Sequence, residues 1–233
     1  MNIGVILNRV FRINNNPLFE YIDQLKDEID KCFLIIPKET FDEKGTDKKA
    51  NYYYGTLKKF LNNLKEHHIE PYVIDYSDLG MFCTEHYIKE IIMAGDIMSY
   101  HQESYDIRHL KQVFKEHDIP VITITVNHYF KPSNTMNQQG QPYKVFTSFY
   151  KAHRSKLRQH SPYQYHLNDI ADKCSQSQQT ITNDSNHDGL SEDQALKNWQ
   201  DYLNNSIQNY KKDREYLPEV LTSQLSIVLA YGL

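Results

Sequence analysis

Short apolar runs alternate along the chain with longer segments in which apolar residues recur every three or four positions. Such runs are typical of strands that are buried on both faces of a parallel sheet. Five of them occur before residue 128, at 3–7, 32–36, 72–74, 91–93 and 121–126. We expect the second strand to end at Pro37 and a polar loop to follow it over 38–50.

The segments between these runs have the spacing of amphipathic helices. From Leu18 to Ile29, apolar residues are separated by 4, 3 and 4 positions and so share one helix face. Similar spacing predicts helices around 57–64 and 107–114, and a short helix that ends within 85–89. Alternating strands and helices predict an α/β fold, a doubly wound five-stranded parallel sheet with right-handed crossovers.

After the fifth strand the pattern changes. Aromatic and apolar residues over 146–157 predict a helix, and the polar stretch of about 160–190 is typical of a flexible interdomain linker. Ser191 precedes two acidic residues and is expected to cap a helix whose apolar stripe runs over 196–207. A last helix is expected to begin near Thr222.

These changes divide the 233 residues into three expected parts. They are an α/β domain over 1–130, a connecting helix and flexible linker over 131–190, and the start of a helical domain over 191–233. Hydrophobic residues make up 39% of the chain, which is enough for a packed core. The net charge of -4 excludes a protein-wide basic field for nucleic acids but leaves a local basic patch open.

Three features indicate a cytoplasmic protein. No apolar stretch approaches the roughly 18 residues needed to cross a bilayer. The N-terminus leads directly into a strand and carries no secretory signal. Cys32, Cys83 and Cys174 are far apart in sequence and have no C-x-x-C spacing, as is typical of reduced thiols. Cys32 lies in an apolar run and is expected to be buried.

Several common sites have no counterpart in the sequence. The turn after the first strand, NRVFRINNNP, contains no glycine, so a dinucleotide site of the G-x-G-x-x-G type is not expected. No Walker A or G-x-S-x-G motif occurs. Adjacent His67 and His68 would point about 100° apart on a helix, and no H-E-x-x-H occurs. Because carboxylates are also unpaired, we assign no metal site and no catalytic residue.

Three segments combine residue types that packing alone explains poorly when they occur together. In the first, 8–17, Arg9 and Arg12 follow a buried strand and reach the carboxyl edge of the sheet, where ligands usually bind. The second covers 144–154 and the third 210–233. Each alone can be a turn or an amphipathic helix.

In this order and spacing, the segments resemble the DNA photolyase/cryptochrome family. The family signature FRRDLRLxDNPAL is matched by LNRVFRINNNPLF over 7–19, where Val10 and Asn15 replace acidic residues. The family segment YKVFTPFxxAW is matched over 143–153, with Ser148 in place of proline and His153 in place of the aromatic residue.

The third segment resembles the family pattern Y-x3-R-x7-T-S-R-L-S. Tyr210 and Arg214 match its first two positions, and the run over 222–226 matches the rest, with Gln224 in place of arginine. The resemblance implies a light-driven repair enzyme. In this family, reduced FAD in a helical domain passes an electron to a cyclobutane pyrimidine dimer flipped out of damaged DNA.

The resemblance also implies roles for particular residues. It assigns the FAD-phosphate contacts to Tyr210, Thr222, Ser223, Gln224, Leu225 and Ser226. A helix that begins near Thr222 would offer free N–H groups and a positive dipole end to the diphosphate. Arg214 resembles a contact to DNA phosphate.

The N-terminal domain of this family often holds an antenna chromophore. In folate-binding members, an Asn-Glu pair follows the fourth strand, and counting back from Asp106 places those positions at His101 and Gln102. Gln102 lacks the carboxylate that would bind the pterin donors strongly. The identity of an antenna is therefore open, and so is its presence.

Members of the family are roughly twice as long as this chain. We therefore expect most of the FAD pocket to lie outside these residues and this chain alone to be inactive. A stripe of Leu221, Leu225, Val228 and Leu229 is expected to leave an apolar patch that permits self-association. Residues beyond 190 are expected to be mobile, while 1–128 fold independently. A cryptochrome-type photoreceptor and a non-catalytic chromophore- or nucleotide-binding module remain alternatives.

Overall fold

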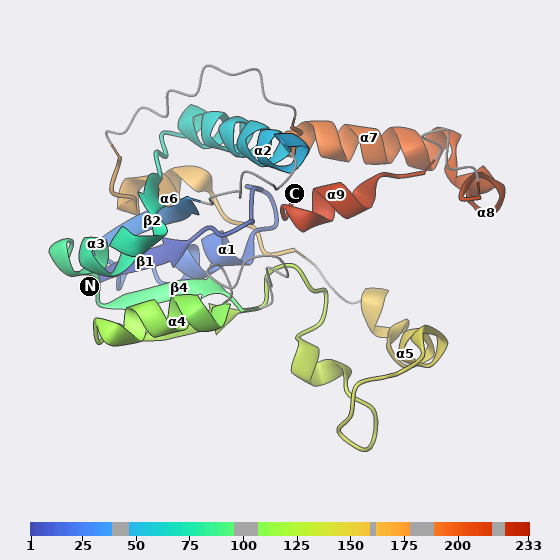
Figure 1. The fold of residues 1–233 in the computed structure, drawn as a ribbon, viewed down its shortest axis with the longest axis horizontal. Helices are drawn as coiled ribbons and strands as arrows, with labels where there is room; N and C mark the ends of the chain where they lie inside the picture. Colours follow the sequence, from blue (N-terminus) through green and yellow to red (C-terminus); the bar gives the residue numbers. More distant parts are fainter. Residues whose placement is uncertain (39–46, 96–106, 159–161, 178–188, 216–221) are drawn as a thin grey trace.

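The computed structural model is an α/β fold with a helical C-terminal part (Figure 1). It describes residues 1–38, 47–95, 107–158, 162–177, 189–215 and 222–233. Its five strands are β1 (Asn2–Ile6), β2 (Lys31–Lys38), β3 (Tyr72–Asp75), β4 (Glu90–Ala94) and β5 (Val121–Ile124). All pairs are parallel and the order is β3-β2-β1-β4-β5. The predicted doubly wound sheet is confirmed.

Helices cover both faces of this sheet. Those described are α1 (Pro17–Gln24), α2 (Asp47–Glu66), α3 (Leu79–Glu85), α4 (Ile107–Glu116), α5 (Phe146–His153), α6 (Leu167–Lys173), α7 (Glu192–Asn205), α8 (Tyr210–Asp213) and α9 (Leu225–Ala230). Successive residues of β2 enter opposite cores, which is why its sequence is apolar throughout. Leu34 packs with α1, α2 and α6, whereas Phe33 packs with α3 and α4.

Several element boundaries differ from the predicted ones. β2 continues through Pro37 to Lys38, because its pairing with β1 ends at Ile35 while its pairing with β3 goes on. The apolar spacing that reaches Ile29 outlasts α1, since turns bring Ile29 into the same core after the helix ends. The loop expected over 38–50 overlaps α2, which begins at Asp47, and residues 39–46 lie outside the described part.

Part of the predicted linker is packed against the α/β domain. Residues 162–177 include α6, whose Ile170 is buried in the core beneath α1. Beyond α6, Ser175 N–H donates to the Cys32 carbonyl at 2.8 Å, and Ser177 N–H donates to the Glu70 carbonyl at 2.9 Å. The chain over 162–177 is therefore held by the sheet domain, contrary to the expectation of a flexible connection there.

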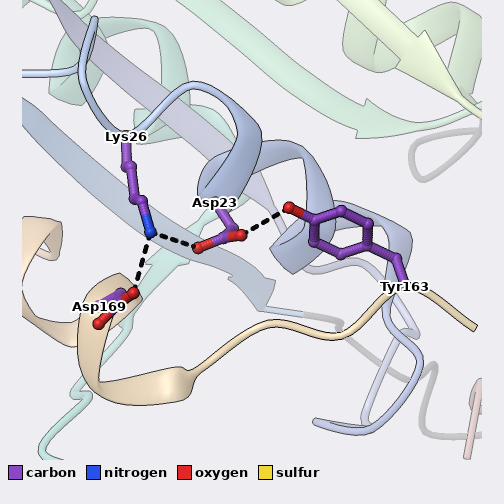
Figure 2. A network of polar contacts seen from close by, with 4 residues as sticks. All are labelled: Asp23, Lys26, Tyr163 and Asp169. Atoms are coloured by element: carbon purple, nitrogen blue, oxygen red, sulfur yellow. Dashed lines mark hydrogen bonds and ion pairs between the residues drawn. The ribbon is translucent and has the colours of Figure 1, made fainter.

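A polar network joins α1 to this packed segment (Figure 2). Lys26 Nζ lies 3.2 Å from the Asp23 carboxylate and 2.9 Å from that of Asp169. The Tyr163 hydroxyl donates to the other Asp23 oxygen at 2.8 Å. The bond from Lys26 lowers the pKa of Asp169. Because the Lys26 and Asp169 side chains remain partly exposed to solvent, their ion pair contributes little to stability and mainly orients α6.

Two of the cysteines meet in space although they are far apart in sequence. The backbones of Cys32 in β2 and Cys174 after α6 pair as an isolated parallel β-bridge, and both thiols are free. Cys32 is fully buried, as predicted, and so is Cys83, whereas Cys174 is half-buried. The hydrogen bond between the two thiols and then burial raise the pKa of Cys32. Burial raises the pKa of Cys83 to about 12.

We expect only Cys174 to react quickly with a disulfide reagent such as DTNB at pH 8. The thiolate is the nucleophile, and the raised pKa values and burial protect Cys32 and Cys83. Titration of the folded chain should release one equivalent rapidly and three after denaturation. Cys174→Ser should abolish the rapid phase, and a rapid phase that survives this change would contradict the assignment.

Candidate functional site

The turn after β1, which carries the first sequence motif, is built around the start of α1. The Asn16 side chain accepts the Leu18 N–H at 3.0 Å and donates to the Arg12 carbonyl at 2.8 Å. Pro17 occupies the first helical position, where its missing N–H costs nothing. Asn16 and Pro17 therefore have a structural role, since they cap the helix and shape the turn.

The Arg12 guanidinium donates hydrogen bonds to three separate parts of the chain: its own turn, the segment after β5 and the C-terminal segment. It donates to the carbonyls of Val126 and Gly232, both at 2.9 Å, and to the Asn127 side chain at 3.0 Å. Its Nε also donates to the Asn15 carbonyl at 3.2 Å. The sequence suggested a ligand-binding arginine at this edge, but these partners within the chain show a structural clamp.

The C-terminal segment docks beside this clamp. Tyr231 is 8% exposed and its ring centroid lies 5.4 Å from that of Tyr52 and 6.1 Å from that of Tyr53. Its carbonyl accepts the Phe11 N–H at 3.1 Å. Gly232 follows at φ +65, where an added Cβ would lie 2.5 Å from the Arg9 carbonyl oxygen, so a glycine is needed.

This docking corrects the expected exposed stripe on the last helix. Val228 is buried against the domain, whereas Ile227 and Leu229 are 46% and 62% exposed. Leu225 is half-buried. Leu221 lies outside the described residues. The segment is therefore anchored on one face by its own domain and is apolar on the other.

A buried carboxylate anchors α7 to the same turn. Glu192 is 6% exposed, and its carboxylate accepts the N–H groups of Ile13 at 2.8 Å and Asn14 at 3.1 Å. Ser191 caps α7 as predicted, since its hydroxyl accepts the Gln194 N–H. Nothing in the sequence distinguished Glu192 from an ordinary first-turn acid, because its partners lie about 180 positions away. Residues beyond 190 are thus attached to the α/β domain at two places.

We expect Glu192→Ala to lower the free energy of unfolding by about 1–3 kcal/mol, because the buried N–H of Ile13 and the partly buried N–H of Asn14 lose their acceptor. Glu192→Gln keeps an acceptor and should cost less. Burial raises the pKa of Glu192 above its ordinary 4.5, against the opposing effect of the two N–H bonds. The folded state therefore favours protonated Glu192. The stability that this preference adds is fully present below pH 4.5 and is lost as the pH rises through the folded pKa.

Urea denaturation between pH 4 and 7 measures this dependence. The stability of Glu192→Gln relative to the parent chain should rise with pH in that window, because glutamine cannot ionise. A difference that stays constant or falls would show that the carboxylate has no raised pKa.

The residues assigned to FAD lie in the outer C-terminal part. Tyr210 begins α8 and is 49% exposed, and the Arg214 N–H donates to its carbonyl at 3.1 Å. Thr222 accepts a hydrogen bond from the Gln224 side chain at 3.0 Å. Ser226 lies in α9, which begins at Leu225, three residues later than predicted. Residues 216–221, which connect the two groups, lie outside the described part.

These side chains fit only part of a FAD site. Gln224 adopts a left-handed conformation and makes no side-chain cap bond, so Thr222 and Ser223 precede a helix start that lacks a side-chain cap. Such a helix start can contact a diphosphate. However, α9 has six residues, and these residues offer no wall to the flavin or adenine rings. His101 and Gln102, the antenna candidates, lie outside the described residues.

A cleft of about 510 Å³ opens beside the turn after β1. Asn14, Asn15, His67 and the stretch 162–168 line it. Ligands of parallel α/β folds usually bind at the carboxyl ends of the strands, where this turn lies. Among the described residues that line the cleft, none is a carboxylate, lysine or arginine, so it suits an uncharged polar ligand better than a phosphate.

The described residues contain neither a metal centre nor a membrane-spanning helix. Among them, no three His, Cys, Asp or Glu side chains gather closely enough to hold a metal ion. None of the helices in the same ranges combines the length and the apolar character needed to span a membrane.

Comparisons with known proteins bear on this architecture. A family profile described as DNA photolyase matches residues 5–166. Similar solved structures include a class III photolyase from Agrobacterium tumefaciens (TM-score 0.64, 16% identity) and the Synechocystis sp. PCC6803 cryptochrome (0.69, 13%). Another is an archaeal photolyase from Sulfolobus tokodaii with two FAD molecules (0.61, 13%).

The alignments cover 99–100% of this chain but only 50–52% of those chains. At these identities, the structural similarity shows the fold alone. No curated protein sequence matches the chain.

Proposed function

Because this chain belongs to the DNA photolyase family, we propose that it forms part of a light-driven, FAD-dependent enzyme that splits cyclobutane pyrimidine dimers in DNA. The match over 5–166 carries the proposal, since it includes the turn after β1 and the segment of α5. The chain spans about half the length of the similar photolyases, so repair is proposed for a full-length form and not for these residues alone.

In that form, bound FAD in its reduced state would supply the electron that cleaves the dimer. The residues of this chain contribute binding: the hydroxyls of Thr222 and Ser223 and the N–H groups at the start of α9 hold the diphosphate. Tyr210, Gln224, Leu225 and Ser226 complete this contact. Arg214, which is exposed, contacts a DNA phosphate.

Removing the two hydroxyls tests the cofactor assignment. In the full-length form, we expect each of Thr222→Ala and Ser223→Ala to weaken FAD binding about tenfold or more, since a bond to an ionised group is worth about 1.5–3 kcal/mol. Quenching of flavin fluorescence on titration measures the affinity. Thr147→Ala, an exposed change in α5, is the control and should leave affinity unchanged. Unchanged affinity in both hydroxyl variants would refute the assignment.

A repair assay tests the activity. Damaged oligonucleotides are mixed with the full-length protein under blue light, and the loss of dimers is followed. We expect light-dependent loss with the full-length form and none with the 233-residue chain. A flavin-loaded full-length protein that never repairs DNA would instead support a cryptochrome-type photoreceptor, the alternative favoured by the similar Synechocystis fold.

The cleft favours a third possibility, a non-catalytic module that binds a chromophore or nucleotide. Reconstitution with methenyl-folate, flavin mononucleotide or a deazaflavin would show a retained absorption band if the domain holds an antenna. His101 and Gln102 are the proposed contacts for it.

Self-association is also proposed, through the exposed side chains of Ile227 and Leu229. Sedimentation analysis of Leu229→Lys tests it.

A further inference from the structure

Charge is distributed very unevenly along the chain. Residues 119–168 contain no Asp or Glu, whereas the whole sequence has 30 of them and a net charge of -4. The basic residues of this stretch are Lys131, Lys144, Lys151, Arg154, Lys156 and Arg158. It includes α5, which lies apart from the sheet in Figure 1. A positively charged surface therefore extends from an acidic protein.

The helix α5 has an inner and an outer aromatic face. On the inner face, His153 is 5% exposed and stacks on Phe149 at 4.7 Å between ring centroids. Phe130 and Tyr143 pack on His153 at 5.5 and 5.7 Å. These contacts hold α5 in place without using its outer face.

On the outer face, two rings are stacked and exposed. The Phe146 and Tyr150 centroids are 5.9 Å apart with an interplanar angle of 22°, and the side chains are 74% and 45% exposed. Arg154 follows Tyr150 by one helical turn, and Lys144 and Lys151 are also exposed. Within the ranges that the structure describes, none of these three cations pairs with a carboxylate.

We propose that the outer face of α5 binds single-stranded DNA. The bases stack on Phe146 and Tyr150, and the phosphates lie against Lys144, Lys151 and Arg154. An apolar protein surface would suit the rings but not the unpaired cations beside them, whereas a nucleic acid strand offers flat apolar faces and negative charge together. A duplex keeps its base faces stacked internally, so the exposed rings favour a single strand.

This surface is separate from the proposed contacts to FAD and from the proposed contact of Arg214 with a DNA phosphate. Its existence follows from charge and exposure alone. Only the choice of DNA over RNA rests on the proposed function. The tests use undamaged oligonucleotides in the dark without FAD, so their outcome is independent of whether the full-length form repairs DNA.

The aromatic pair is tested on the 233-residue chain by fluorescence anisotropy with a labelled dT15 strand at 50 mM salt. We expect binding that weakens tenfold or more in Phe146→Ala/Tyr150→Ala, since each base–aromatic stack is worth about 1–3 kcal/mol. Both side chains are exposed, so the thermal melt should be unchanged. The control is Tyr87→Ala, because Tyr87 is also 74% exposed but lies outside the basic stretch, and affinity should persist.

The cations are tested through salt dependence. Lys151→Gln/Arg154→Gln should reduce the slope of log K against log salt by about 0.7 for each charge removed. Lys111→Gln, at an exposed position of α4, should leave the slope unchanged. Undetectable dT15 binding, or binding that ignores the aromatic pair, overturns the proposal. So does equal affinity for a duplex, while tenfold tighter binding of the matching RNA overturns the assignment to DNA.

Discussion

Replacing Tyr231 by alanine is expected to lower the free energy of unfolding by about 3 kcal/mol, the usual cost of removing a buried aromatic ring. The ring is enclosed by Tyr52 and Tyr53, and the guanidinium carbon of Arg9 lies 5.6 Å from its centroid. Its loss leaves a cavity between α2 and the turn after β1. Urea denaturation followed by circular dichroism measures the change.

The matched control is Leu229→Ala, two positions away. Leu229 is 62% exposed, so its truncation should cost less than about 0.5 kcal/mol. Equal effects of the two substitutions would mean that the C-terminal segment does not dock on the domain. A loss at Tyr231 alone supports the docked arrangement.

The second large effect is expected at Arg12. Arg12→Ala should lower the free energy of unfolding by about 2–3 kcal/mol, because the carbonyls of Val126 and Gly232 lose a charged donor at once. Arg12→Lys keeps the charge but cannot present a fork of donors, so it should recover less than half of the loss.

A local readout separates this clamp from general destabilisation. Hydrogen exchange of the Phe11 amide, which bonds to the Tyr231 carbonyl, should become faster in Arg12→Ala under native conditions. Asp172→Ala, an exposed change in α6, should leave that exchange unchanged. Protection of the Phe11 amide that survives in Arg12→Ala would show that Arg12 does not hold the segment.

The sheet was predictable because its central strands β1, β2 and β4 are buried on both faces and so read as continuous apolar runs. Element ends were less predictable, since Ile29 after α1 and Val126 after β5 are buried by packing that continues beyond the helix and the strand. Apolar spacing reports which side chains face the core and does not report where the helical hydrogen bonds stop.

The site was predicted only in part. The motif residues Asn16 and Pro17 were readable as a helix start, but the partners of Arg12 and Glu192 come from the other end of the chain. Contacts between residues so far apart do not affect the spacing of apolar residues, so a single sequence does not reveal them. The polar composition of 160–190 likewise concealed α6, because one buried side chain, Ile170, suffices to seat that short helix.

The clamp at Arg12 has a consequence for synthesis on the ribosome. Its guanidinium binds the carbonyl of Gly232, 220 positions downstream, so this bond must wait until that residue has left the ribosome. The strands β1 and β2 can pair much earlier, which leaves a nascent intermediate in which the turn after β1 is not yet bonded to the C-terminal segment. Non-local closure of this kind slows folding, and chaperones would find the turn after β1 accessible until residue 232 has been synthesised.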